Sequence, residues 1–361
     1  MKTIGFKAFS MAFALGLGFM GSMAAIPESA HPDFDLSKIP FPEKYKTMGL
    51  AFLKDGRMVL ATTDFIGGGE VPAAGSDKHK IYLVSGATGA APTNIQMVEI
   101  SNNWLQIAGI VVANEKLYVS DRDGFYEINQ LSAPADLKTN RRLIVKWPNE
   151  NTWNNNSFQW HQWVFTPMYK GGSFYGPYSG SIRPGGPSDV NQTTKSAGAF
   201  LKCDLTGKIE NFAGGLRSPN GANLDEATGE MAVTDNQGSW LPSSTFAFMK
   251  QGYWFGHNNV SVATPTKPIV IKAGVYAGDW LLGDVNNPGL MRISIDRVGT
   301  GTPNGAVFWF SKGFGNSAIN RMAYGPDGAS RFDLSRGNAR AGLHLLRVST
   351  RSGDVVRKVV F

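Results

Sequence analysis

The sequence has few cysteines, few charged residues and few long apolar runs, and each shortage excludes a class of protein. Cys203 is the single cysteine, so an internal disulfide and a Cys-x-x-Cys-His site for covalent haem are both excluded. Only 17% of the residues are charged and 42% are hydrophobic, which argues against a disordered chain. After residue 24 no segment approaches about 20 consecutive apolar residues, so the sequence predicts no transmembrane helix there.

The positive charge is not concentrated in a stripe. The formal net charge is +7 at pH 7, but the Lys and Arg residues are scattered along the chain. A nucleic-acid-binding surface needs its basic residues clustered on one face or element. We therefore expect no nucleic-acid partner.

The first 24 residues have the pattern of a secretory signal peptide. Lys2 and Lys7 precede an apolar stretch that runs from Ala8 to Met20. Small residues follow it, among them Ser22 and Ala24. The apolar stretch is short for a membrane anchor. The sequence therefore predicts an exported protein that is cleaved after Ala24, with a lead-in segment over residues 25–44.

The composition indicates an all-β fold. Gly occurs 43 times, aromatic residues make up 11% of the chain, and apolar residues alternate with polar ones in short segments. Cys203 lies in one such segment, Phe200-Leu-Lys-Cys-Asp-Leu205, which predicts a buried or half-buried strand residue.

One element recurs along the chain: an apolar strand, a turn rich in Gly and Asp, and a second strand. Because each hairpin has an apolar face that it cannot bury alone, the copies must stack around a common centre. Six copies predict a six-bladed β-propeller over residues 45–330. The copies begin at residues 49, 109, 163, 221, 278 and 320.

In a propeller, the ends of the inner strands and the loops beside them converge on a central funnel. The fourth copy places Arg217 and Asn220 before one strand and Asp235 at the end of the next. The sequence therefore predicts that Arg217 and Asp235 flank the central cavity.

The motif Gly215-Leu-Arg-Ser-Pro-Asn-Gly221, followed by Thr234-Asp-Asn-Gln-Gly238, resembles the fourth-blade signature of the glucose/sorbosone dehydrogenase-type propellers. These are similar to the soluble quinoprotein sugar dehydrogenases, which use pyrroloquinoline quinone and calcium. Ser120-Asp-Arg-Asp-Gly-Phe-Tyr-Glu127 and Gly283-Asp-Val285 support the resemblance, which covers roughly residues 45–330.

The resemblance implies roles for individual residues. His161 matches the base that takes a proton from the sugar's anomeric hydroxyl, and a neutral imidazole is available near neutral pH. Arg217 matches the arginine that holds a quinone carboxylate, because a guanidinium can bind a carboxylate through two hydrogen bonds. Gln106, Asn220 and Arg321 are the remaining candidate cofactor contacts.

Asp235 and Asn236 are the candidate calcium contacts, since hard cations prefer carboxylate and carbonyl oxygens. Each assignment has a structural alternative. Asp235 and Asn236 can form an Asx-turn that closes the blade, Arg217 can pair with a neighbouring Asp, and His161 can pack between Trp160 and Trp163.

The C-terminal segment 331–361 admits two interpretations. It contains Ala341-Gly-Leu-His-Leu-Leu-Arg-Val348 and ends in Lys358-Val-Val-Phe361. This pattern looks like the short β-rich tails that direct surface sorting in some Gram-negative bacteria. Alternatively, these strands close the propeller.

We therefore expect an exported, quinone-dependent oxidoreductase that oxidises an aldose or related sugar and passes electrons to a diffusible acceptor. The expected location is the periplasm or surface of a Gram-negative bacterium. Two alternatives remain. One is a calcium-dependent lactonase or hydrolase, with Asn220 and Asp235 as metal ligands and Glu43 or Glu70 as a further ligand. The other is a non-catalytic propeller that binds polysaccharide through its exposed aromatic residues.

Overall fold

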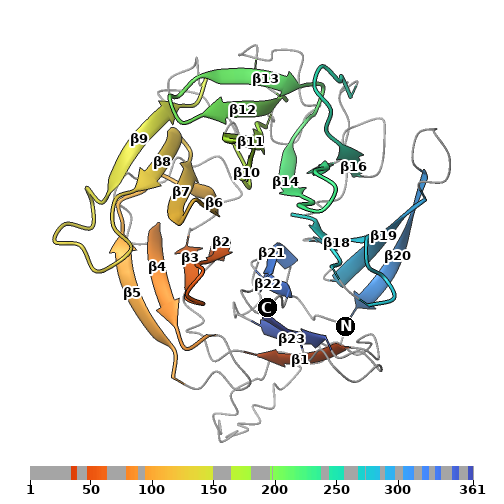
Figure 1. Cartoon of the computed structure of the whole chain (residues 1–361), viewed down its shortest axis with the longest axis horizontal. Coiled ribbons are helices and arrows are strands. Elements are labelled where there is room, and N and C mark those ends of the chain that lie inside the picture. The colour runs from red at the N-terminus through yellow and green to blue at the C-terminus, as the bar shows by residue number, and fades with distance from the viewer. Residues whose placement is uncertain are drawn as a thin grey trace, which may run out of the picture.

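The computed structural model describes somewhat more than half of the chain. The described residues are 34–38, 47–62, 79–87, 94–148, 164–179, 196, 198–236, 244–255, 267–272, 274–284, 289–296, 304–312, 319–324, 330–334, 344–348 and 357–360. Every regular element in these ranges is a β-strand (Figure 1). The all-β prediction is confirmed.

The strands form antiparallel sheets, and five of the sheets are built from consecutive strands. The first two sheets contain β2 (Thr47–Phe52), β3 (Met58–Thr62), β4 (Lys80–Ser85) and β5 (Gln96–Ser101), then β6 (Ile107–Ala113), β7 (Lys116–Asp121), β8 (Gly124–Ile128) and β9 (Arg141–Lys146). The next two contain β10 (Met168–Lys170), β11 (Ser173–Pro177), β12 (Phe200–Asp204) and β13 (Ile209–Ala213), then β14 (Pro219–Leu224), β15 (Met231–Asp235) and β16 (Thr245–Phe248). The fifth contains β17 (Ile269–Val270), β18 (Trp280–Asp284), β19 (Gly289–Asp296) and β20 (Asn304–Lys312).

The sheets are arranged radially around a centre, as in a β-propeller. Figure 1 shows β2, β6, β10 and β14 nearest the middle and β5, β9 and β13 at the periphery. The first three of these sheets therefore run outward from their first strand to their last, and β16 and β20 lie outside β14 and β18 in Figure 1. This arrangement confirms the propeller prediction.

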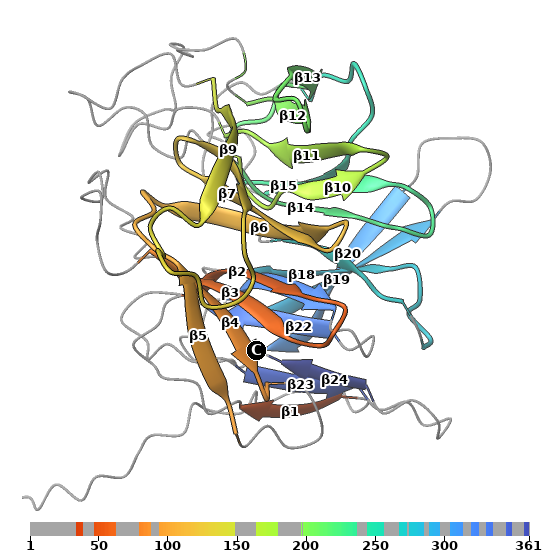
Figure 2. The same cartoon turned by 60° about the vertical axis from the view of Figure 1, so that its left-hand side comes forward.

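A sixth sheet has a different composition, so the structure shows five blades of consecutive strands where the sequence predicted six. It joins β21 (Ile319–Tyr324), β22 (Ser330–Leu334), β23 (His344–Val348) and β24 (Arg357–Val360) from the end of the chain to β1 (Phe34–Lys38) from its beginning. Phe34 pairs with Val348 and Lys38 with His344. Figures 1 and 2 both place β1 beside β23. Residues from the segments 25–44 and 331–361 thus share one sheet.

The fifth repeat is also out of phase with the prediction. Gly278 precedes β18, which is the second strand of its sheet, whereas Gly49, Gly109 and Gly221 lie in first strands. The first strand of the fifth sheet is the two-residue strand β17. The prediction missed it because two residues are too few to produce a visible alternation of apolar and polar positions.

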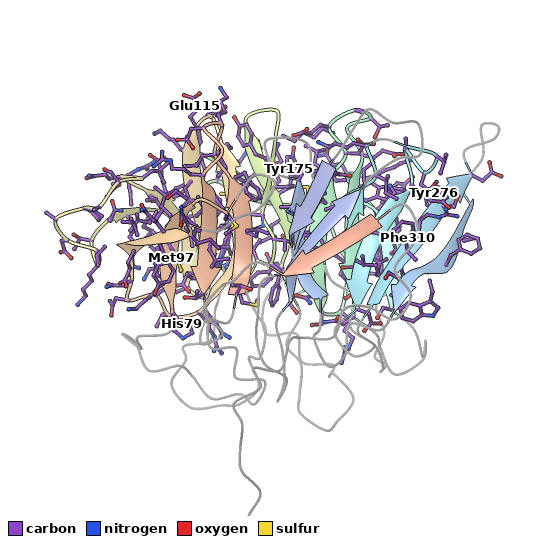
Figure 3. All side chains as sticks on the ribbon, turned by 90° about the horizontal axis from the view of Figure 1, so that it is seen from below. His79, Met97, Glu115, Tyr175, Tyr276 and Phe310 are labelled. Carbon is purple, nitrogen blue, oxygen red and sulfur yellow. The ribbon has the colours of Figure 1, made fainter. Side chains whose placement is uncertain are left out.

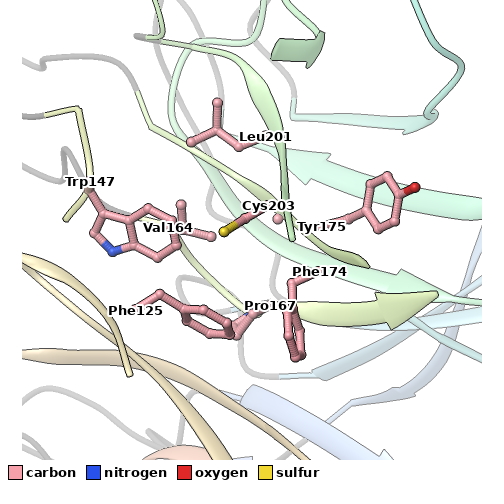
Figure 4. Close-up of a pocket in the computed structure, with 9 residues that line it drawn as sticks. Phe125, Trp147, Val164, Pro167, Phe174, Tyr175, Leu201 and Cys203 are labelled. Atoms are coloured by element: carbon pink, nitrogen blue, oxygen red, sulfur yellow. The ribbon is translucent and has the colours of Figure 1, made fainter. Parts of the chain in front are cut away.

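Apolar side chains fill the space between neighbouring sheets. Val59 and Ile81 of the first sheet belong to one buried cluster with Ile110 and Val119 of the second. Gly109 lets the second and third sheets approach closely, because a Cβ atom there would lie 2.7 Å from the main-chain nitrogen of Thr166. A small apolar pocket lies between these two sheets (Figure 4).

Cys203 lines that pocket from β12 and is 3% exposed. The prediction of a buried strand cysteine is confirmed. Burial also raises the pKa of its thiol to about 12, so Cys203 stays protonated and weakly nucleophilic at neutral pH.

Candidate functional site

Four sheets have a β-bulge at the same place, where their first strand begins and their second strand ends. In each, the first residue of the first strand pairs with the last residue of the second strand, and the next residue of the first strand is unpaired. Such a bulge bends the strand and redirects side chains. The paired positions are Thr47 with Thr62, Ile107 with Asp121, Pro219 with Asp235, and Ile319 with Leu334.

This end of the strands marks one face of the propeller, which we call the bulge face. Figure 3 shows Glu115, in the turn between β6 and β7, and His79, just before β4, on opposite faces. Lys80, next to His79, pairs with Thr62 at the end of β3. His79 therefore lies on the bulge face, where it is fully buried.

Asp235 fixes the segment before β14. Its carboxylate oxygens accept the main-chain N–H groups of Arg217 at 2.7 Å and Ser218 at 2.8 Å. The main-chain N–H of Asn236 donates to the carbonyl oxygen of Ser218 at 3.2 Å. Asp235 therefore contacts Arg217 through the main-chain N–H of Arg217, and that the two residues flank a central cavity stays a prediction.

Asp121 makes the same kind of contact in the second sheet. We call this arrangement, in which one carboxylate at the end of a second strand accepts two consecutive main-chain N–H groups before the first strand, a clamp. The carboxylate of Asp121 accepts the main-chain N–H groups of Leu105 at 2.9 Å and Gln106 at 2.6 Å. The Arg122 guanidinium donates to the side-chain oxygen of Gln106 at 3.2 Å. The two clamps are equivalent, so Gln106 corresponds in position to Ser218, and Arg122 to Asn236.

Sequence reasoning missed Asp121, Arg122 and His79 as site residues. The signal for the first two was present: Asp121 and Asp235 each end a strand that follows a Gly-containing first strand. The turn between the strands differs in length, so the carboxylates lie 15 and 17 residues after the residues they bind. That difference hides the repeat when the sequence alone is aligned.

The loop that carries Gln106 has further supports. Arg141 donates to the carbonyl oxygens of Asn102 at 3.1 Å and Asn103 at 2.9 Å, and its guanidinium lies 4.0 Å from the centre of the Trp104 ring. Asn103 adopts a positive φ of 60°, a conformation that Asn tolerates better than most residues. Gln106 itself is 3% exposed. This loop is held at several points, so Gln106 is presented with little freedom.

Burial controls the protonation of both clamp carboxylates. It raises the pKa of Asp121 and the pKa of Asp235 from 3.8 to about 6, although the main-chain N–H groups oppose the rise. In Asp121 the nearby Asp123 carboxylate adds to the rise in pKa. Two carboxyl groups that titrate near pH 6 therefore hold the two segments of the bulge face.

A buried guanidinium group, that of Arg122, and a half-buried one, that of Arg217, lie beside these carboxylates. Burial lowers the pKa of Arg122 to about 9 and also lowers the pKa of Arg217, and in each case the neighbouring carboxylate opposes the shift. Arg122 is 5% exposed. Both side chains remain cationic at neutral pH and place positive charge inside the bulge face.

The candidate metal contacts, Asp235 and Asn236, differ in their surroundings. Both oxygens of Asp235 already accept main-chain N–H groups. The side-chain oxygen of Asn236 is buried and has no hydrogen-bond partner, while its amide nitrogen lies 3.5 Å from the Ser218 hydroxyl. Within the described residues no group of three or more His, Cys, Asp or Glu side chains could hold a metal ion. Calcium binding at this pair stays a prediction.

The segments just before β10 and just after β11 link the two carboxylate sites. Ser120 donates to the carbonyl oxygen of Val164 at 2.6 Å, and the Ser179 hydroxyl donates to the Ser218 hydroxyl at 3.1 Å. Thr166 is buried with a φ of 41°, and its hydroxyl accepts the N–H of Ala222 at 2.7 Å. A positive φ is strained for a β-branched residue, so this contact between sheets carries a cost in backbone strain.

The structure describes the three further predicted site residues to different extents. Asn220 is the half-buried bulge residue between Pro219 and Gly221. Arg321 lies on β21 at the register position of Gly221, and its side chain is outside the described residues. His161 also lies outside them, so its role as a base stays a prediction.

The radial arrangement of antiparallel sheets defines an all-β propeller (Figure 1). Among solved structures, the chain is similar to an oxidoreductase of the glucose dehydrogenase type from Thermus thermophilus, with 14% identity, a TM-score of 0.60, and coverage of 91% of this chain and 98% of that one. It is also similar to the soluble aldose sugar dehydrogenase from Escherichia coli in its apo form, with 12% identity, a TM-score of 0.59, and coverage of 88% and 100%. At such identities the likeness shows the fold alone.

No family model matches the sequence. No curated protein matches it either. In the described segments we find no helix with the length and hydropathy needed to cross a membrane.

Proposed function

We propose that the protein is a sugar-acting propeller enzyme whose site lies on the bulge face. The observation that carries this proposal is the repeated clamp, in which Asp121 and Asp235 each bind two main-chain N–H groups and thereby fix Gln106 and Arg217. Two main-chain segments fixed by buried carboxylates suit a preorganised binding site. The likeness to sugar dehydrogenase folds supports the choice of substrate class.

More specifically, we propose a quinone-dependent dehydrogenase, and the donor set fits a polycarboxylate quinone. The buried Arg122 and the half-buried Arg217 supply positive charge, Gln106 supplies an amide, and Asn236 supplies a buried oxygen. When bound, pyrroloquinoline quinone would supply the hydride acceptor for sugar oxidation. Arg217 would hold a carboxylate of that cofactor, with Asn220 and Arg321 as further contacts. His161 would take the proton from the anomeric hydroxyl of the sugar.

Calcium is the second proposed ligand. The buried side-chain oxygen of Asn236 has no hydrogen-bond partner, and an amide oxygen is a suitable ligand for a hard cation. Asp235 adds negative charge beside it, but its main task in this proposal is to hold Arg217 and Ser218. Further ligands would come from main-chain carbonyl groups.

The two terminal segments of the chain also have proposed roles. We propose that the sixth sheet closes the propeller as its sixth blade, which makes 331–361 closing strands and brings part of 25–44 into the fold. We also propose that residues 1–24 are removed on export to the periplasm or cell surface. Mass spectrometry of the protein recovered from the cell envelope would test the cleavage after Ala24.

The test of the activity is reconstitution. Purified protein is titrated with pyrroloquinoline quinone in the presence and absence of calcium, and binding is followed by quenching of tryptophan fluorescence. The reconstituted protein is then assayed for sugar-dependent reduction of an artificial electron acceptor. We expect saturable binding and turnover of an aldose. Absence of quinone binding in both conditions would overturn the dehydrogenase proposal.

A calcium-dependent lactonase is the second candidate, favoured by the unpartnered oxygen of Asn236 beside Asp235. It predicts calcium binding without quinone and hydrolysis of sugar lactones. In that case Asn236→Ala should abolish calcium binding, while Arg217→Lys should leave lactone hydrolysis nearly unchanged. If neither quinone nor calcium binds, a polysaccharide-binding propeller becomes the better account.

A further inference from the structure

The outermost strand of the fifth sheet, β20, presents an unusual surface. It is nine residues long, and within the described residues its one partner strand is β19. Figure 1 shows it at the periphery of the propeller. Three consecutive apolar side chains on it are exposed: Val307 by 59%, Phe308 by 48% and Trp309 by 46%. We call the segment 305–309 the apolar edge.

The outer strands of the first three sheets carry charged residues, whereas β16 of the fourth sheet carries none. β9 contains Arg141, Arg142 and Lys146, β13 contains Glu210, and β5 contains Glu99. Charged residues on a sheet edge prevent it from pairing with another strand, because pairing would remove them from water. The apolar edge has no charged residue, and the first one after it is Lys312. It lacks the protection that these neighbouring edges have.

The side chains behind the apolar edge are ordered by mutual contacts. The Arg292 guanidinium lies 4.0 Å from the centre of the Tyr276 ring and 5.2 Å from that of Phe308, and it forms an ion pair with Asp279 at 3.4 Å. The Tyr276 and Phe310 rings meet edge to face at 5.8 Å, and Figure 3 shows both on this side of the propeller. The edge strand therefore rests on a firm support and needs little reordering to bind a partner.

We propose that the apolar edge is a dimer interface, in which β20 pairs antiparallel with β20 of a second copy. The sequence is self-complementary about a two-fold axis at Phe308. In that register Trp309 lies opposite the partner's Val307. Phe310, which is buried and is the extra residue of a bulge against β19, lies outside the regular pairing. Aromatic and β-branched residues pair favourably across strands. No like charges meet anywhere between residues 304 and 311.

This arrangement is an isologous interface, since the same segment serves both copies. It joins two sheets edge to edge and leaves the bulge face of each copy open. The inference is independent of the proposed enzymatic function, because it involves none of the residues of that site.

Sedimentation velocity of the purified protein over a concentration series tests the proposal. We expect the parent to form a dimer that Val307→Lys dissociates, because pairing would bury the added charge. Leu143→Lys on β9 is the matched control: Leu143 is 42% exposed on another outer strand, so this variant should remain dimeric. A monomeric parent, or a dimer that Val307→Lys leaves intact, would overturn the proposal.

Cross-linking locates the axis. Phe308→Cys should form a disulfide-linked dimer under mild oxidation, because directly paired residues on antiparallel strands have Cα atoms about 4.5–5.5 Å apart, within disulfide range. The native Cys203 is buried, so the parent supplies a clean background. Leu143→Cys should remain monomeric on a non-reducing gel. Equal cross-linking of the two variants would show random collision and would overturn the proposed register.

Discussion

Asp235→Asn should remove a pH dependence of stability that the parent protein possesses. Burial raises the pKa of the Asp235 carboxyl from 3.8 to about 6. The folded protein therefore keeps this proton up to about pH 6, whereas the unfolded chain releases it near its ordinary pKa. Between these values the folded state binds more protons, so the free energy of unfolding falls as the pH rises. The contribution is fully present below about pH 4 and is lost above about pH 6.

The size of the effect follows from the shift in pKa. One pKa unit corresponds to about 1.4 kcal/mol, so a rise of about two units gives roughly 3 kcal/mol across this window. Asn offers one oxygen, so in Asp235→Asn one of the two N–H groups, on Arg217 or on Ser218, loses its acceptor. That loss makes the variant about 1–3 kcal/mol less stable than the parent near pH 4. Because Asn does not titrate, the stability of the variant does not follow the fall of about 3 kcal/mol in the parent, so the difference should close or reverse towards pH 7.

The assay is urea unfolding followed by tryptophan fluorescence, repeated from about pH 4 to about pH 7. Asp121→Asn should behave in the same way, because burial raises the pKa of Asp121 to about 6 as well. Asp136→Asn is the control: the Thr139 hydroxyl lowers the pKa of this exposed carboxyl, so its small contribution is lost as the pH falls. Parallel stability curves for the parent and Asp235→Asn would refute the reasoning.

Four further results are expected. Arg217→Lys should weaken quinone binding by roughly 1–3 kcal/mol in a fluorescence titration, because an ammonium group cannot reproduce the two-pronged contact, whereas unchanged affinity would remove Arg217 from the cofactor site. His161→Ala should lower kcat by roughly 10²–10⁴-fold with little change in quinone affinity, and a matching fall in Tm would instead favour a packing role. Gly109→Ala should cost about 3 kcal/mol in urea unfolding, since its Cβ would lie 2.7 Å from the nitrogen of Thr166, while Gly171→Ala, with open space around it, should cost only about 1 kcal/mol for its left-handed backbone. Cys203 should react with a thiol reagent only after unfolding, because it is 3% exposed; rapid labelling of the native protein would contradict its burial.

The sequence alone was sufficient for the fold class. The repeated hairpins predicted a propeller, because an apolar strand face must be covered by a neighbouring copy. It also located Cys203 on a buried strand. These predictions succeeded because the alternation of apolar and polar residues along a strand is a local property.

The role of Asp235 was decided by the tertiary structure. The sequence allowed a metal ligand, a partner for the Arg217 guanidinium or a turn, and the fold uses the carboxylate to bind the N–H groups of Arg217 and Ser218. Its equivalence to Asp121 became visible only in the strand register, since the turns between the paired strands differ in length.

Two other features depended on contacts between distant parts of the chain. β17, two residues long, is recognised as a strand because it pairs with β18, and β1 is placed by β23, about 300 residues further along. Residue pattern determines which face of a strand is apolar, because that depends on neighbours two positions away. Which strand lies beside it, and which carboxylate reaches which amide, depends on the closing of the whole ring, and no local pattern records that.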